Sequence, residues 1–314
     1  MSVQFLPYAF FEGEYVPFKD ARVSVATHAL QYGTGVFGGM RGYRSADGSV
    51  INLFRMHDHF RRLSQSARMI RINLPYGIDD LGDIAMELTR RNAADSNVYF
   101  RPYAYKSGLN LAPTLSGIAD QFALYMVRLE NYYSAPNGLS VMVSTWQRLN
   151  DTAIPSRGKV SGSYINSSLA NDEAKTYGFD EAIMLDSRGK VSEGSASNLF
   201  IVRDGVLLTT PVTASILEGI TRRTIIKLAA DLGIPLEIRE IDRTELYIAD
   251  ELFFCGTGVQ ISPISKVDRR EVGSSFPGSI TTTLQERFKA VITGQLPEYR
   301  EWLTPVPVAV ASAQ

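Results

Sequence analysis

The spacing of apolar residues is the feature of this sequence that most restricts its fold. Period-two runs typical of strands alternate with 3.6-residue stripes typical of helices, and no repeat of fixed period is present. Residues 8–18 and 38–54 predict two hairpins, the second with its turn at Asp47-Gly48. This mixture excludes solenoids and propellers and predicts an α+β fold.

The rest of the first half combines helices and strands. Residues 57–72 and 79–92 carry apolar side chains at helical spacing, and residues 97–105 and 122–129 have the composition of strands. The polar segment ENYYSAPNG at 130–138 contains Pro and Gly, which are typical of a linker. The first half therefore combines two hairpins, two helices and two strands, followed by a linker.

The second half repeats this mixture. We expect a strand at 139–145, a helix at 162–177, a hairpin at 181–194, strands within 198–208, a helix from about Gly219 that stops at Gly233, strands at 250–255 and 259–264, and a helix at 278–292. At roughly 150 residues per domain, 314 residues correspond to two domains. We therefore expect a first domain over 1–130, a linker over 131–138 and a second domain over 139–314.

Charge and cysteine content restrict the partners and the compartment. The chain has 32 Lys and Arg against 33 Asp and Glu, so no basic field is available for nucleic acid or an anionic membrane. The single Cys255 cannot form an internal disulfide or a zinc cluster with other cysteines. No apolar run reaches membrane-spanning length, and no basic segment precedes the apolar N-terminal stretch. These features predict a cytoplasmic protein without a metal site.

A glycine motif at residues 33–38 needs separate consideration. Gly33, Gly35 and Gly38 match G-x-G-x-x-G, and Asp58 lies twenty residues beyond Gly38, as in dinucleotide-binding proteins. That function requires a helix that opens at the glycines, whereas the following residues predict a hairpin. We therefore do not assign a dinucleotide to this motif.

Polar residues that could carry chemistry gather within 157–200. Lys159, Tyr164, Glu193 and Asn198 all fall near the ends of predicted elements, where catalytic groups are commonly placed. Small residues flank Lys159 and leave room for a planar ligand. Further along the chain, a helix that begins near Ile220 would offer the backbone N–H groups of Ile220 and Thr221 to an anion.

A second anion site is indicated by the strand at 97–103. Alternation puts Tyr99, Arg101 and Tyr103 on one face and Val98, Phe100 and Pro102 on the other. The polar face therefore predicts a cradle for an anion. The tight turn of Gly256, Thr257 and Gly258 can present backbone N–H groups to a carboxylate as well.

Four separated blocks carry a resemblance to a known family. They are K-x4-Y from Lys159, S-E-G-x-x-x-N-L-F around Glu193, L-x-G-I-T-R at 217–222 and C-G-T-G at 255–258. In this order they resemble the fold type IV pyridoxal-phosphate enzymes, closest to the branched-chain amino acid aminotransferases. The resemblance implies a small N-terminal α/β domain, a larger C-terminal pseudo-barrel domain and a homodimer.

The resemblance also implies an activity and a role for each residue of the cofactor site. The enzyme would be a transaminase of branched-chain amino acid biosynthesis that moves the amino group of hydrophobic L-amino acids to 2-oxoglutarate. Lys159 would form a Schiff base with pyridoxal 5'-phosphate and shuttle a proton between substrate and cofactor. Glu193 would keep the pyridine nitrogen protonated, and Tyr164 would bond the phenolic oxygen. Residues assigned to the phosphate are Arg62, Ile220, Thr221 and Thr257.

Substrate contacts are implied in the same way. The assigned residues are Tyr32, Phe37, Tyr99, Arg101, Gly256, Thr257 and Gly258. Arg101 would face the distal carboxylate of 2-oxoglutarate, and Tyr32 and Phe37 would form the apolar wall for a branched side chain. The residue pattern alone leaves open that Arg62 lies on a solvated helix surface and that Phe37 only packs in the core.

Three departures from the family pattern concern specificity. Gly38 stands where branched-chain enzymes usually have Glu, Glu218 replaces the usual Pro of L-P-G-I-T-R, and Gly258 replaces the usual Ala. We therefore expect a broader substrate range, with a D-amino acid or (R)-amine transaminase as the alternative. An aminodeoxychorismate lyase and a binding protein that lacks bound cofactor are the other rivals.

Overall fold

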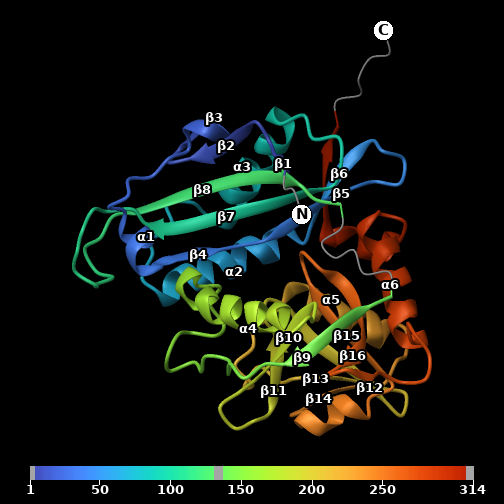
Figure 1. Cartoon of the computed structure of the whole chain (residues 1–314). Helices are drawn as coiled ribbons and strands as arrows, with labels where there is room; N and C mark the ends of the chain where they lie inside the picture. The colour runs from blue at the N-terminus through green and yellow to red at the C-terminus, as the bar shows by residue number, and fades with distance from the viewer. Residues whose placement is uncertain (1–3, 131–136, 309–314) are drawn as a thin grey trace. The chain divides into compact units, whose positions relative to one another are not determined.

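The computed structural model describes residues 4–130 and 137–308 of the chain (Figure 1). Its α-helices are α1 (His28–Tyr32), α2 (Met56–Met69), α3 (Ile78–Arg91), α4 (Tyr164–Thr176), α5 (Ile220–Asp231) and α6 (Ser279–Ile292). The strands before residue 130 are β1 (Gln4–Phe5), β2 (Tyr8–Phe11), β3 (Glu14–Pro17), β4 (Gly35–Phe37), β5 (Met40–Arg44), β6 (Val50–Phe54), β7 (Val98–Lys106) and β8 (Asp120–Arg128). The later strands are β9 (Leu139–Val143), β10 (Glu181–Leu185), β11 (Val191–Gly194), β12 (Asn198–Arg203), β13 (Val206–Thr209), β14 (Leu236–Ile238), β15 (Glu251–Gly256), β16 (Gln260–Val267), β17 (Arg270–Glu271) and β18 (Leu303–Pro307).

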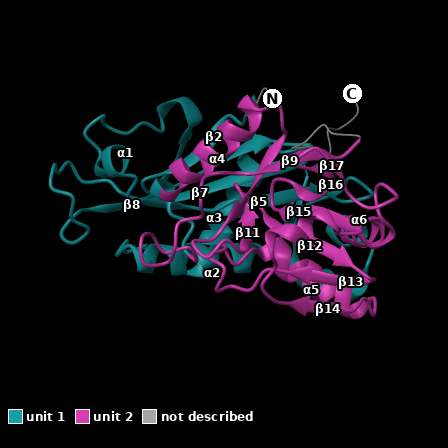
Figure 2. Ribbon diagram, turned by 60° about the horizontal axis from the view of Figure 1, so that its bottom comes forward, with its two compact units in different colours: residues 1–130, 158–162, 290–314 teal, residues 131–157, 163–289 magenta. Residues whose placement is uncertain are grey.

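The chain forms two compact units, shown in different colours in Figure 2. Unit 1 comprises residues 1–130, 158–162 and 290–314, and unit 2 comprises 131–157 and 163–289. Segment 158–162 joins unit 1 because Val160 forms an antiparallel bridge with Val36, and the C-terminal segment joins it because β18 pairs with β6. The domain division expected from the sequence did not place these two later segments with the first 130 residues, because no local pattern marks their pairing. Residues 131–136 of the expected linker lie outside the described residues.

Unit 1 is built on an antiparallel sheet with the strand order β18-β6-β5-β7-β8-β2-β3, to which β4 and β1 add as side branches. Its longest ladder joins β7 and β8, which pair from Val98↔Arg128 to Lys106↔Asp120. Helix α2 contacts β4 and β7, and α3 contacts β2. The predicted alternation along β7 is confirmed, because Val98, Phe100 and Pro102 are buried while the residues between them are only partly buried.

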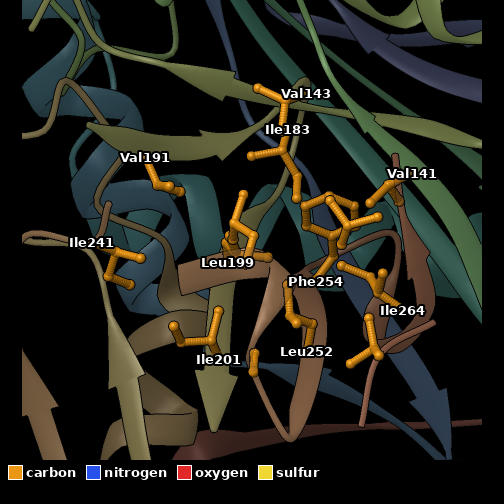
Figure 3. Packing of buried hydrophobic residues seen from close by; sticks show 14 of the residues in the cluster. Val141, Val143, Ile183, Val191, Leu199, Ile201, Ile241, Leu252, Phe254 and Ile264 are labelled. Atoms are coloured by element: carbon orange, nitrogen blue, oxygen red, sulfur yellow. The ribbon is translucent and has the colours of Figure 1, made fainter. Parts of the chain in front are cut away.

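Unit 2 contains a mixed sheet with the order β11-β10-β9-β16-β15-β12-β13-β14. Its core is a layer of buried aliphatic and aromatic side chains in which neighbouring strands face each other in register (Figure 3). Leu199 of β12 pairs with Phe254 of β15, and Ile201 pairs with Leu252. On another side, α4 approaches β10 closely through Ala170 and Ala174, which pack with Met184. This packing fixes the strand ends that carry the polar residues discussed below.

Most predicted elements are confirmed, and the sequence analysis missed the short ones. Helix α1, strand β4 and strand β18 were not predicted, since each is too short for its periodicity to be resolved. Gly33 adopts a left-handed conformation with φ 65° and ends α1, and Gly35 opens β4. The glycine motif is therefore followed by a strand, which confirms that it has no dinucleotide-binding frame.

A partly buried carboxylate in unit 2 predicts a specific acid sensitivity. Glu245 accepts hydrogen bonds from Arg239 at 2.8 and 3.0 Å and from Arg203 at 2.9 Å, and the Arg239 bond is the main cause that lowers its pKa from 4.5 to about 2. Since the folded-state pKa lies below the unfolded one, this stabilisation is present above pH 4.5 and is lost as the pH falls toward 2.

We expect Glu245→Gln to flatten this part of the pH dependence of stability. Thermal unfolding followed between pH 4.5 and pH 2 should show a steeper fall in Tm for the wild type than for the variant. Glu237→Gln is the matched control, because Glu237 faces the same Arg239 at 3.5 Å but is 60% exposed. Parallel curves for wild type and Glu245→Gln would contradict the assignment.

Candidate active site

Lys159 is fixed by its backbone to β4 in unit 1. The Phe37 N–H donates to the Lys159 carbonyl at 3.0 Å, and the Gly162 N–H donates to the Gly33 carbonyl at 3.1 Å. The partly buried side chain places its Nζ 5.1 Å from the centroid of the Phe37 ring. The lysine therefore has a defined position that does not depend on its own side-chain contacts.

A serine that the sequence analysis missed supports this position. Ser66, on α2 and 1% exposed, accepts a hydrogen bond from the Lys159 N–H at 3.2 Å and donates to the Arg62 carbonyl at 2.8 Å. Lys159 is thereby connected to the helix turn that carries Arg62, which is partly buried. A signal was present, because Ser66 follows Leu63 by three residues and so continues the buried face of the helix.

The predicted anion cradle lies on the face of the unit 1 sheet that also carries the Phe37 ring. The guanidinium carbon of Arg101 is 4.7 Å from the Phe37 ring centroid and 5.3 Å from that of Tyr99. Phe37 therefore contacts both the guanidinium of Arg101 and the amine of Lys159. Tyr125 stands opposite Arg101 on β8, where burial raises its pKa and the charge of Arg101 opposes that rise.

The Tyr99 hydroxyl lies directly against Gly39. A Cβ atom at Gly39 would overlap the Tyr99 hydroxyl, so the missing side chain at position 39 makes room for the phenol. Tyr32 lies in α1 and is 39% exposed, with its hydroxyl donating to the Leu111 carbonyl at 2.5 Å. The structure thus brings Phe37, Tyr99 and Arg101 together, while the hydroxyl of Tyr32 is engaged by the 107–112 loop.

In unit 2, the carboxylate of Glu193 is held by three donors. Its side chain is 4% exposed and pairs with Arg148 at 2.8 Å, where Arg148 is itself 10% exposed. The Asn198 side chain donates to Glu193 at 2.8 Å and to the Leu217 carbonyl at 2.9 Å. The Leu217 N–H is 3.2 Å from both carboxylate oxygens. Such a carboxylate is buried and held in a fixed position, unlike the surface acid that a hairpin end could also carry.

Arg148 was missed by the sequence analysis, and Asn198 was noted without a role. Arg148 lies in an irregular segment after β9, where no periodicity or motif marks it. Asn198 opens β12 in the block that contains Glu193, so its position offered a signal. The two residues link Glu193 to the segment that leads into α5.

The start of α5 in unit 2 carries backbone N–H donors that no side chain caps. Its N-cap, Gly219, has no side-chain cap, and a Cβ there would overlap the Asn198 amide oxygen. Ile220 and Thr221 are 1% and 4% exposed, and their N–H groups have no acceptor within residues 4–130 and 137–308. The arrangement matches the predicted anion site, because first-turn N–H groups and the helix dipole attract negative charge.

Two charged neighbours of this anion site, Arg222 and Glu218, have hydrogen-bond partners elsewhere in unit 2. Arg222 turns back to donate to the Thr210 carbonyl at 2.9 Å, and burial lowers its pKa. Glu218, one of the departures, accepts a hydrogen bond from Arg157 at 2.9 Å. Tyr164 is the first residue of α4 and is partly buried.

The 256–258 turn lies between β15 and β16, as predicted, and its residues are partly buried. Ser197 lies beside Gly256, and its buried hydroxyl has no hydrogen-bond partner in the described part of the chain. Cys255 next to the turn is fully buried, and burial raises the pKa of its thiol. The turn thus offers backbone and hydroxyl donors, while its cysteine is unreactive.

The residues present fit pyridoxal phosphate. A fixed, buried carboxylate suits a ring nitrogen that must stay protonated, and the uncapped helix start suits a phosphate. One hydrogen-bond network, from Glu193 through Asn198 and Leu217, connects this carboxylate to the segment that leads into α5.

Within the described residues, no group of three His, Cys, Asp or Glu side chains could hold a metal ion, and no helix is both long and apolar enough to cross a membrane.

This fold and this set of residues define an aminotransferase. The family of class IV amino-transferases matches residues 35–267, and the chain belongs to this family. Enzymes of this class depend on pyridoxal phosphate, and the chain is accordingly a pyridoxal-phosphate enzyme with the class IV fold.

The particular relatives are branched-chain enzymes. The chain is 42% identical over 306 residues to the "Probable branched-chain-amino-acid aminotransferase" of Synechocystis, covering 97% of this chain and 99% of that one. A crystal structure of the branched-chain aminotransferase of the archaeon Thermoproteus uzoniensis with norvaline matches with a TM-score of 0.92 at 39% identity, covering 97% and 100%. The branched-chain amino acid aminotransferase of Thermobaculum terrenum, in its PLP-bound holo-form, matches with a TM-score of 0.92 at 36% identity, covering 96% and 99%.

Proposed function

We propose that this enzyme transfers the amino group of branched-chain and other hydrophobic L-amino acids to 2-oxoglutarate. The observation that carries the proposal is the Phe37 ring, which contacts the amine of Lys159 and the guanidinium of Arg101 on one face of the sheet. An apolar ring between two cations can receive a substrate that has both an apolar side chain and a carboxylate. The names of the relatives support the branched-chain assignment.

Lys159, Glu193 and Tyr164 are the proposed residues for the cofactor ring. When bound, pyridoxal phosphate supplies an electron sink for the bonds at the substrate Cα. Lys159 would hold the cofactor through its aldehyde carbon and would move a proton at its Nζ. Glu193 would face the ring nitrogen and favour its protonated form, and Tyr164 would hydrogen-bond the phenolic oxygen.

Arg62, Ile220, Thr221 and Thr257 are the proposed residues for the cofactor phosphate. Ile220 and Thr221 contribute the backbone N–H groups that begin α5. Arg62 contributes a guanidinium that can bind a phosphate through two hydrogen bonds, and Thr257 contributes a hydroxyl from the turn after β15.

The substrate is assigned to the aromatic face of unit 1 and to the 256–258 turn. Arg101 binds the distal carboxylate of 2-oxoglutarate, and Tyr99 adds its hydroxyl. Phe37 and Tyr32 contribute apolar surface for the branched side chain, which gains about 25 cal/mol per Å² that it removes from water. The backbone N–H groups of the turn bind the second carboxylate.

The two half-reactions of the purified enzyme test this function. With bound pyridoxal phosphate, L-leucine should bleach the visible absorption of the cofactor, and 2-oxoglutarate should restore it with release of glutamate. D-alanine should leave the spectrum unchanged. Absence of glutamate, or a response to D-alanine alone, would refute the proposal. Pyruvate release without an amino acceptor would instead indicate a lyase, and a protein without the absorption band would indicate a binding protein.

A side activity toward (R)-amines is favoured by Gly38. Its N–H donates to the Pro102 carbonyl at 2.8 Å, and a Cβ at this position would come within 2.6 Å of Pro102 Cγ. No acidic group is therefore present at this point to select against uncharged substituents. We expect slow turnover of (R)-1-phenylethylamine beside robust turnover of leucine, and undetectable turnover would exclude the side activity.

A homodimer and a cytoplasmic location complete the proposal. Apolar side chains of unit 1 are strongly exposed, among them Val25 at 86%, Leu30 at 64% and Leu111 at 76%. A second copy of the chain would remove these apolar side chains from water, which favours association. Equilibrium sedimentation should give twice the chain mass of 34.7 kDa, and the monomer mass would refute the dimer.

A further inference from the structure

Arg148 is a buried cation that contacts three separate segments of unit 2. Its Nη2 lies 2.8 Å from a carboxylate oxygen of Glu193 on β11. Its Nη1 donates to the Ser167 hydroxyl of α4 at 3.3 Å, and its Nε donates to the Ser215 carbonyl at 3.4 Å. One guanidinium therefore joins the acid proposed for the ring nitrogen to the helix that begins with Tyr164.

The backbone around Arg148 is fixed independently of the guanidinium. The Arg148 N–H donates to the Leu185 carbonyl of β10 at 2.8 Å. The preceding carbonyl, that of Gln147, accepts a hydrogen bond from the Asn166 side chain of α4 at 3.0 Å. A substitution at position 148 therefore removes the guanidinium without releasing this segment from β10 and α4.

Burial of the ion pair determines what the positive charge does. The Glu193 side chain is 4% exposed and the Arg148 side chain 10%, so water screens neither charge well. Burial penalises the charged form of a carboxyl group, and an opposite charge beside it counters this penalty. The guanidinium at 2.8 Å therefore favours the ionised form of Glu193.

Two further ionisable groups of unit 2 interact with Glu193. Arg222 of α5 interacts with the charge of Glu193 but donates its hydrogen bond to the Thr210 carbonyl. Cys255 of β15 is fully buried, and burial, with a smaller contribution from Glu193, raises the pKa of its thiol, which stays neutral. Of these three neighbours, Arg148 is the one that forms an ion pair with Glu193.

We propose that Arg148 is a positioning residue that keeps Glu193 ionised and orients its carboxylate toward the cofactor ring. Without the guanidinium the neutral form of Glu193 would be favoured, and a neutral carboxyl group cannot hold the ring nitrogen in its protonated form. Ser167 and Ser215 fix the guanidinium, so its charge acts on Glu193 from one place. The inference rests on the proposed function, since it assumes that Glu193 faces the ring nitrogen.

Unfolding of the enzyme without cofactor tests the ionisation directly. In Arg148→Met, folding should favour the neutral form of Glu193, whereas the unfolded chain ionises it above about pH 4.3, the ordinary pKa of a glutamate. A group whose pKa is raised by folding contributes stability below its unfolded pKa and loses it as the pH rises. Relative to the wild type, the folding equilibrium constant of the variant should therefore fall between about pH 5 and pH 8, by up to about tenfold per pH unit.

Two further variants separate the charge of Arg148 from its shape. Adding Glu193→Gln to Arg148→Met should abolish the extra pH dependence, which urea unfolding measures in each variant. Arg148→Lys should restore the wild-type pH dependence, because it keeps the charge. It should restore only part of the rate, because an ammonium group lacks the planar fork that also reaches Ser167 and Ser215.

Kinetics of the loaded enzyme show the consequence for the reaction. The leucine half-reaction of Arg148→Met should be about 10- to 10²-fold slower, since the charge it removes acts through Glu193 and not on the ring itself. Arg203→Met is the matched control: Arg203 belongs to the same unit, is 30% exposed and pairs with Glu245 at 2.9 Å. Its loss can weaken the fold but should leave the half-reaction, and the pH dependence between about pH 5 and pH 8, as in the wild type.

The possible outcomes separate this role from a structural one. A stability difference between Arg148→Met and the wild type that does not change with pH would show that Arg148 only supports the fold. An unchanged or faster half-reaction in that variant would overturn the inference as well. Failure of the proposed function is distinguishable, since the wild type itself would then form no glutamate from leucine and 2-oxoglutarate.

Discussion

Replacing Lys159 with Met should reduce the rate of transamination by at least about 10³-fold, within the range that a positioned acid–base group contributes. The fold should survive, because the contacts that fix position 159 to Phe37 and Ser66 are made by its backbone. Stopped-flow measurement of the leucine half-reaction gives the rate, and thermal unfolding gives the stability. Borohydride reduction followed by peptide mapping should attach the cofactor to Lys159 in the wild type and to no peptide in the variant.

Lys227→Met is the matched control for this substitution. Lys227 lies on α5 with a side chain that is 58% exposed and pairs with Asp231, so its loss should leave rate and labelling unchanged. Reduction that labels another lysine in the wild type would show that the chemistry is carried elsewhere, and the assignment of the active site would then be wrong.

Glu193→Gln should lower both activity and stability. The rate should fall about 10²- to 10³-fold, since a preorganised charge is removed from the site. Because Arg148 is 10% exposed and would lose its carboxylate partner, the free energy of unfolding should decrease by about 3–5 kcal/mol. Urea unfolding of the enzyme without cofactor measures the second effect independently of the first.

A second substitution separates the two effects of Glu193. Adding Arg148→Met to Glu193→Gln removes the uncompensated charge, so stability should largely return, whereas the rate should stay low because the cofactor nitrogen still lacks its carboxylate. If activity returned together with stability, Glu193 would have only a structural role. Retention of the wild-type rate in Glu193→Gln would have the same meaning.

Long periodic segments and local motifs made most of the fold predictable from the sequence. Both hairpins of the first half and the long helices were found, because each has enough turns or alternations to show its period. The return of β18 to the sheet of unit 1 was not predictable, since a five-residue strand that pairs with β6 leaves no local signal for its partner. The same applies to segment 158–162, which a bridge to Val36 and hydrogen bonds to Gly33 and Ser66 join to unit 1.

Site residues that belong to sequence motifs could be predicted, whereas residues that reach the site through long-range contacts could not. Glu193 and Lys159 belong to recognisable blocks, and strand alternation alone indicated Arg101 and Tyr99. Ser66 and Arg148 act on Lys159 and Glu193 across wide gaps in the sequence, so no local pattern shows these contacts, although helical spacing places Ser66 on the buried face of α2. The close contacts between tyrosine hydroxyls and glycines, such as Tyr99 with Gly39, also depend on how the strands pair, so the sequence did not predict them.

The burial of Cys255 makes the molecule convenient for spectroscopy. As the only thiol in the chain, fully enclosed and with a raised pKa, it should ignore maleimides and other alkylating dyes while the protein is folded. A cysteine introduced at an exposed position would therefore be labelled alone. Fluorophores or spin labels could then follow motion near Phe37 and Arg101 during turnover without first removing a native thiol.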